Sequence, residues 1–96
     1  MVSSLLVGEP YPIPDINDPH IQELGVWAIS EHNKQAKDAL KFKNVTTGDE
    51  QVVEGFNYWL IIDALNSKGK DSRYKAVVWE REWENFRNLT SFAPVN

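Results

Sequence analysis

The sequence of 96 residues contains no cysteine and only two histidines. The lack of cysteine excludes disulfides, thiolate nucleophiles and thiolate metal sites, so packing alone must stabilise the fold. His20 and His32 lie about 120° apart around one helix, so they cannot share a metal as an i, i+4 pair does. The five glycines are scattered and form no phosphate-binding loop. We therefore expect no enzyme, no catalytic residue, no metal ligand and no cofactor.

Positive charge is also scarce, since ten Lys and Arg stand against fourteen Asp and Glu, for a net charge of −4. Without a basic surplus the chain is poorly suited to binding phosphates, and no nucleic-acid partner is expected. No apolar run approaches the roughly 20 residues that span a bilayer, so no membrane partner is expected either. Residues 1–8 lack the features of a signal peptide. Because such a signal is cleaved from a mature protein, both a secreted and a cytoplasmic location stay open.

Proline is concentrated near the N-terminus, where four of the five prolines lie between Pro10 and Pro19. This clustering excludes regular helix and favours an extended arm. The whole sequence is 42% hydrophobic, which is enough apolar material for one core. We predict a flexible N-terminal trunk over residues 1–17 and a single domain over residues 18–96.

A helix is predicted over residues 18–37. Asp18 supplies an N-cap, and Pro19 follows at the first helical position, where its missing N–H is no loss. Apolar residues then recur at spacings of three and four, which gives one narrow apolar face. Gly25 lies within this face and costs the helix about 1 kcal/mol relative to alanine. We expect another backbone to approach the helix closely at Gly25, as a sheet lying across it would.

From Leu40 onward the pattern changes to alternation, which predicts strands joined by hairpins. Every second residue from Phe56 to Ala64 is apolar, so one face of this strand should cover the helix. Residues 66–71 form a polar connection, and residues 89–95 form the last strand. The predicted fold class is α+β, with an antiparallel sheet of four to five strands and one helix on one face.

Three glutamates alternate near the third predicted turn. Glu80, Glu82 and Glu84 have strand spacing and suggest the paired carboxylates of a glycosidase. Arg81 lies between them and favours a solvated turn instead.

Three segments carry apolar residues without an obvious place in the core. They are residues 5–8 on the trunk, residues 51–55 at a hairpin bend (the first loop), and residues 82–86 in a charged turn (the second loop). Each has an ordinary alternative: the leucines fold back on the sheet, Val53 continues a strand, and Trp83 caps the core. In an antiparallel meander, however, the first and third turns share one end of the sheet, and the trunk can reach it. Tryptophan is a frequent binding hot spot, so this end is a candidate interface.

Two of these segments match motifs of a known family. Residues 51–55 read Gln-Val-Val-Glu-Gly and match the Gln-x-Val-x-Gly motif of the cystatins. Residues 24–33 read Leu-Gly-Val-Trp-Ala-Ile-Ser-Glu-His-Asn and resemble the helix signature of the plant branch, Leu-Ala-Arg-Phe-Ala-Val-x-Glu-His-Asn. The order of trunk glycine, helix signature, first loop and tryptophan turn also fits. The sequence therefore resembles a phytocystatin over residues 5–95.

The resemblance implies a cystatin-like sheet wrapped around the helix. It also implies a reversible, tight-binding inhibitor of papain-like cysteine proteases, active as a monomer in plant defence or in control of endogenous proteolysis. A domain-swapped dimer would hide the first loop and lose this activity. The resemblance places the protease contacts on the trunk and the two loops, at Leu6, Val7, Gly8, Gln51, Val52, Val53, Glu54, Gly55, Glu82 and Trp83.

Departures from the family pattern concern the same segments. Glu54 replaces a common alanine, and its carboxylate should weaken binding unless it reaches water or a cation. Glu82 stands where proline is usual, and the trunk offers one glycine where many relatives have two. The alternative is a non-inhibitory carbohydrate- or protein-binding module that uses surface tryptophans. A flat sheet face that carries Trp59, Trp79 and Trp83 in solvent would favour that module, whereas Trp83 alone at a loop tip favours the inhibitor.

Overall fold

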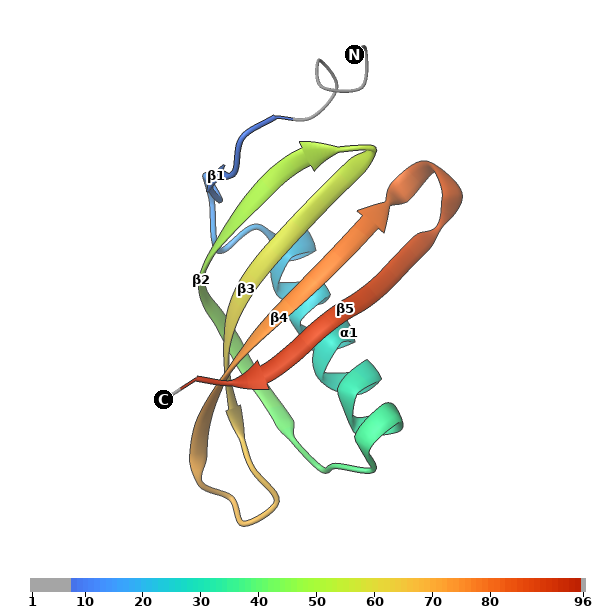
Figure 1. Ribbon diagram of the computed structural model, residues 1–96. Helices are drawn as coiled ribbons and strands as arrows, with labels where there is room; N and C mark the ends of the chain where they lie inside the picture. The colour runs from blue at the N-terminus through green and yellow to red at the C-terminus, as the bar shows by residue number, and fades with distance from the viewer. Residues whose placement is uncertain (1–7, 96) are drawn as a thin grey trace.

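The computed structural model describes residues 8–95. Its elements are β1 (Tyr11–Pro12), α1 (Pro19–Ala36), β2 (Lys41–Val53), β3 (Gly55–Leu65), β4 (Asp71–Arg81), the short 3₁₀ helix η2 (Glu82–Glu84) and β5 (Phe86–Pro94). The five strands form one antiparallel sheet in the order β1-β2-β3-β4-β5, and α1 lies across one face of it (Figure 1). This arrangement confirms the predicted α+β fold class. Within residues 8–95, no helix is long and apolar enough to cross a membrane.

Helix α1 agrees with the predicted helix to within one residue at each end. The Asp18 side chain accepts a hydrogen bond from the His20 N–H at 2.9 Å, and Pro19 opens the helix. At the other end, Lys37 adopts a left-handed conformation with φ of 54°, and its N–H donates to the Asn33 carbonyl. The cap and the proline thus place the start of the helix as the sequence indicates.

The His-Asn pair of the helix signature fastens the end of α1 to the sheet. Asn33 Nδ2 donates to the Leu40 carbonyl at 2.9 Å, and the Leu40 N–H donates to Asn33 Oδ1 at 3.0 Å. The His32 ring stacks on Phe92 of β5 with 4.0 Å between ring centroids, and its Nε2 lies 3.0 Å from Asp38 Oδ2. The hydrogen bond from His32 also lowers the pKa of Asp38. These signature residues therefore hold the fold together at the end of the helix.

Gly25 faces the sheet, as its place on the apolar face predicts. A Cβ at Gly25 would lie 2.5 Å from Val45 Cγ2 and 2.7 Å from Phe42 Cε1. The close neighbours are thus two side chains of β2, and the expectation of a neighbouring backbone was wrong. Register shifts between Phe42 and Asn44 and between Val45 and Thr47 interrupt the β2–β3 ladder here. Such bulges bend a strand, which allows β2 to curve over the helix.

The core lies between α1 and one face of the sheet. Alternate residues of β3 and β4 point into it, which confirms the prediction that this face covers the helix. The buried apolar residues are Ile21, Leu24, Ala28, Ile29, Leu40, Val45, Tyr58, Leu60, Ile62, Ala64, Ala76 and Val78.

Strand β1 was not anticipated, because it lies within the proline-rich segment. Tyr11 and Pro12 pair with Glu50 and Asp49 of β2 at the edge of the sheet, a position that tolerates proline.

The division into a trunk over residues 1–17 and a domain over residues 18–96 stays a prediction. Strand β5 begins at Phe86, three residues before the predicted start.

Candidate functional site

The two loops singled out in the sequence lie at the same end of the sheet. Figure 1 shows the β2–β3 and β4–β5 turns together at the top, with the β3–β4 connection at the opposite end. The described chain begins at this end, because the Gly8 N–H donates to the Val52 carbonyl at 2.8 Å. We call Gly8, the first loop and the second loop together the loop end. The predicted contacts Leu6 and Val7 lie outside the described residues.

Gln51 attaches the trunk to the first loop. Its Nε2 donates to the Gly8 carbonyl at 2.9 Å, next to the backbone bond from Gly8 to Val52. A Cβ on Gly8 would meet Val52 at an ordinary 3.8 Å, so space alone does not require glycine there. The first residue of the Gln-x-Val-x-Gly motif thus holds Gly8 beside the first loop.

Glycine at position 55 is required by both conformation and space. Its φ is +90°, a region that L side chains rarely adopt. A Cβ would also lie 2.2 Å from the Glu80 carbonyl oxygen and 2.7 Å from Arg81 Cγ. The last residue of the motif therefore lets the first loop lie directly against β4.

The two valines of the first loop differ in exposure. Val52 is 41% exposed, whereas Val53, the last residue of β2, is half-buried. Val53 lines a pocket of about 350 Å³ together with Asn57, Trp79 and Thr90. The loop end thus presents aliphatic surface at its tip.

The second loop presents an exposed tryptophan. Trp83 lies in η2 and is 66% exposed, more than any other large hydrophobic side chain in residues 8–95. The loop closes at Asn85, whose φ is 50° and whose N–H donates to the Glu82 carbonyl at 3.1 Å. Trp27, Trp59 and Trp79 are half-buried. Trp83 therefore does not cap the core.

Arg81 connects the two loops. Its Nη1 donates to Glu54 Oε1 at 3.1 Å, so the unusual carboxylate of the first loop reaches a cation. Its Nε forms an ion pair with Glu84 Oε1 at 3.1 Å. This contact does not have the geometry of a hydrogen bond, so Nε has no hydrogen-bond partner. The guanidinium lies 4.7 Å from the ring centre of Trp79 and 4.4 Å from that of Phe86. Sequence analysis missed this connection.

Trp79 of β4 also contacts the first loop. Its Nε1 donates to the Glu54 carbonyl at 2.8 Å, and its ring meets the Phe86 ring edge-on at 5.3 Å between centroids. Together with Arg81, these contacts fix the position of the first loop relative to the second.

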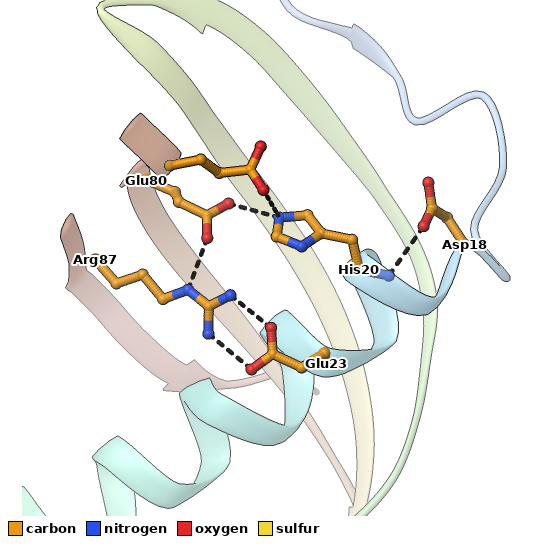
Figure 2. A network of polar contacts seen from close by, with 6 residues as sticks. Asp18, His20, Glu23, Glu80 and Arg87 are labelled. Carbon is orange, nitrogen blue, oxygen red and sulfur yellow. Dashed lines mark hydrogen bonds and ion pairs between the residues drawn. The ribbon is translucent and has the colours of Figure 1, made fainter. Parts of the chain in front are cut away.

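A buried carboxylate lies below the second loop. Glu80 is only 5% exposed, so the expectation of a solvated turn at Glu80 was wrong. Its Oε1 lies 2.6 Å from His20 Nε2, and its Oε2 accepts a hydrogen bond from Arg87 Nε at 2.7 Å (Figure 2). Arg87 also donates two hydrogen bonds to Glu23, which raise the pKa of Arg87 and lower that of Glu23. The network joins the first turn of α1 to β4 and β5.

Comparison with solved structures identifies the class of fold. The salivary cystatin of the soft tick Ornithodoros moubata superposes with a TM-score of 0.78 at 20% sequence identity, over 93% of this chain and 98% of that chain. The five-stranded antiparallel sheet with one helix is therefore the cystatin fold.

Sequence comparisons place the chain within this class. It is 51% identical to cysteine proteinase inhibitor 8 of Oryza sativa subsp. japonica over 93% of this chain and 72% of the relative. It is 46% identical to cysteine proteinase inhibitor 5 of Arabidopsis thaliana, over 94% of this chain and 74% of the relative. A family model described as an aspartic acid proteinase inhibitor (SQAPI) matches residues 13–95. The chain belongs to the plant cysteine proteinase inhibitors, the phytocystatins, which are protease inhibitors and not enzymes.

Proposed function

We propose that the protein is a reversible, tight-binding inhibitor of papain-like cysteine proteases and that the loop end occludes the active-site cleft. The observation that carries this proposal is the joint exposure of Val52 and Trp83 on two loops fixed to each other through Arg81. A preformed apolar edge can enter an existing groove at a limited ordering cost.

Each segment of the loop end has a distinct role in this proposal. The first loop enters the cleft near the catalytic cysteine, where Val52 and Val53 exclude water. Trp83, preceded by Glu82, covers the primed side of the cleft. Gln51 holds Gly8 beside the first loop. Leu6 and Val7 are assigned to the non-primed subsites by the family resemblance. No peptide carbonyl is presented for attack, so the inhibitor is not consumed as a substrate.

The exposure of the tryptophans supports the inhibitor over the carbohydrate-binding alternative. Trp59 and Trp79 are half-buried on the sheet, and Arg81 and Phe86 flank the Trp79 ring. Trp83 alone projects from a loop tip. The active form in this proposal is the monomer, because a domain swap that straightens the first loop would remove Val53 from the loop end.

The proposal is tested by assaying papain and pepsin against the same preparation of monomer. Pepsin is included because the description of the matching family model favours an aspartic protease target. We expect papain to lose activity near an equimolar ratio, pepsin to remain active, and mass spectrometry to show intact inhibitor after prolonged incubation. Circular dichroism at the acidic assay pH controls for unfolding. Inhibition of pepsin alone, or progressive cleavage within residues 51–55, would overturn the proposal.

The ion pair with Arg81 should limit the loss of papain affinity that the Glu54 carboxylate causes. Exposed ion pairs contribute only about 0–1 kcal/mol, so Glu54→Ala loses little by breaking this one. Because the substitution also removes a carboxylate from the interface, we expect it to tighten papain binding by roughly two- to fivefold. Arg81→Gln should weaken binding at least tenfold in the native background, because it leaves the Glu54 carboxylate unpaired at a desolvated interface and frees the two loops. In the Glu54→Ala background, Arg81→Gln should weaken papain binding by a smaller factor.

Inhibition constants for the four proteins of this cycle give the coupling between the two residues. Arg73→Gln is the matched control, since Arg73 lies on the same strand and pairs with Asp63 at 2.8 Å away from the loop end. An equal cost of Arg81→Gln in both backgrounds would contradict the proposed role of Arg81.

A further inference from the structure

Three potential metal ligands converge where α1, β4 and η2 meet. They are His20 Nε2, a carboxylate oxygen of Glu80 and one of Glu82, and all three atoms lie within 4.8 Å of one another. His20 Nε2 lies 2.6 Å from Glu80 Oε1 and 3.7 Å from Glu82 Oε2. The three side chains line a pocket of about 430 Å³, which leaves room for an ion and a water molecule. Of the three ligands, His20 and Glu80 lie outside the proposed protease contacts, whereas Glu82 belongs to the second loop.

The charges around the pocket favour a cation. Glu23, Glu80 and Glu82 are acidic, whereas Arg87 is the basic residue that binds Glu23 and Glu80. Among the ion pairs of residues 8–95, Glu82 faces only His20. With a neutral His20, the cluster therefore carries two more negative than positive charges, and a divalent cation would balance them.

We propose that His20, Glu80 and Glu82 bind a zinc ion. Zinc accepts both imidazole nitrogen and carboxylate oxygen as ligands, whereas magnesium and calcium prefer oxygen ligands alone. Zinc–ligand bonds of about 2.0 Å place tetrahedral ligands about 3.3 Å apart. The two distances from His20 Nε2, 2.6 Å to Glu80 and 3.7 Å to Glu82, lie near this spacing, and His20 and Glu80 need to separate by less than about 1 Å. The neutral imidazole binds zinc through Nε2 and carries its proton on Nδ1, so two bonds to zinc replace the hydrogen bond between His20 and Glu80, and water occupies the fourth position.

Further contacts hold the ligands in place (Figure 2). Arg87 binds the oxygen of Glu80 that points away from His20, and Glu23 in turn holds Arg87 through two hydrogen bonds. The Asp18 cap fixes the first turn of α1, which carries His20. Outer contacts of this kind orient metal ligands and sharpen the site.

The position of the site gives zinc a structural effect on the second loop. Glu82 directly precedes Trp83, and both belong to η2. Zinc would therefore join η2 to the first turn of α1 and restrict the motion of Trp83 relative to the helix.

Isothermal titration calorimetry of the full chain with zinc chloride at neutral pH tests this proposal without any protease. We expect one zinc ion per chain, with no comparable heat from magnesium chloride. Glu82→Gln should weaken zinc binding at least tenfold, because it removes one ligand while the 71% exposed Glu82 side chain contributes little to folding. Tryptophan fluorescence of the native chain should change with the same midpoint.

Two controls distinguish this site from adventitious binding. Glu84→Gln alters a neighbouring carboxylate of η2 outside the cluster, and His32→Gln removes the other imidazole–carboxylate pair. Both variants should bind zinc as the native chain does. Absence of zinc binding, undiminished binding by Glu82→Gln, or loss of binding in a His32→Gln variant that keeps the native circular dichroism spectrum would each overturn the proposal.

Discussion

Gly55→Ala is expected to weaken papain inhibition at least 100-fold. An alanine Cβ would lie 2.2 Å from the Glu80 carbonyl oxygen, a backbone atom that cannot rotate away. A non-glycine residue at φ of +90° adds strain of about 1–3 kcal/mol. The first loop must then lift away from β4, which breaks the hydrogen bond from Trp79 to the Glu54 carbonyl and displaces Val53. The measurement is the papain inhibition constant, with circular dichroism to verify the fold.

Gly69→Ala is the matched control for backbone strain. Gly69 also has a positive φ, of 74°, but a Cβ there would meet no atom within 4 Å. It lies in the β3–β4 connection at the opposite end of the sheet from the loop end. We expect Gly69→Ala to lower stability slightly and to inhibit papain as the native protein does. Equal inhibition by Gly55→Ala and the native protein would contradict the proposed role of the first loop.

Glu80→Ala is expected to lower the free energy of unfolding by about 3–5 kcal/mol, the usual cost of removing one partner from a buried ion pair. The substitution leaves Arg87 with Glu23 alone and leaves His20 without its 2.6 Å partner. It also opens a cavity between β4 and α1. A domain of this size has about 5–15 kcal/mol of stability in total, so the loss is a large share of it.

Urea unfolding at neutral pH measures this loss directly. Glu82→Ala is the control, because the Glu82 side chain is 71% exposed and surface ion pairs contribute about 0–1 kcal/mol. We expect the midpoint of Glu82→Ala to stay near that of the native protein and that of Glu80→Ala to fall well below it. Coincident midpoints for the two variants would show that the Glu80 network does not stabilise the fold.

Local sequence patterns were enough to predict most of the fold. The cap at Asp18 and the apolar spacing placed α1 to within a residue, and alternation from Phe56 onward placed the buried face of β3. Strand β1 was missed because it has only two residues, one of them a proline, and so shows no alternation. The pairing of Tyr11 with Glu50 depends on residues far apart in the chain, which a local pattern does not report.

The candidate site was only partly predictable. The order of the strands placed both loops at one end, but the link from Arg81 to Glu54 spans 27 residues and depends on side-chain geometry. Burial of Glu80 did have a signal, because it continues the inward alternation of Ala76 and Val78. The charged neighbours Arg81 and Glu82 favoured a solvated turn, so the sequence analysis did not predict that Glu80 is buried. The partners of Glu80 come from α1 and β5, so its ion pairs had no local signature.

Titration of papain with monomeric protein, together with Val53→Asp and Val26→Asp variants, tests the central claim most directly. Val53 is half-buried in the first loop, whereas Val26 is a 48% exposed valine on α1, far from it in the sequence. The proposed function predicts that native protein and Val26→Asp abolish papain activity near an equimolar ratio and that Val53→Asp does not. Full papain activity at excess native protein, or equal inhibition by all three proteins, would contradict the proposal that the loop end occludes the protease.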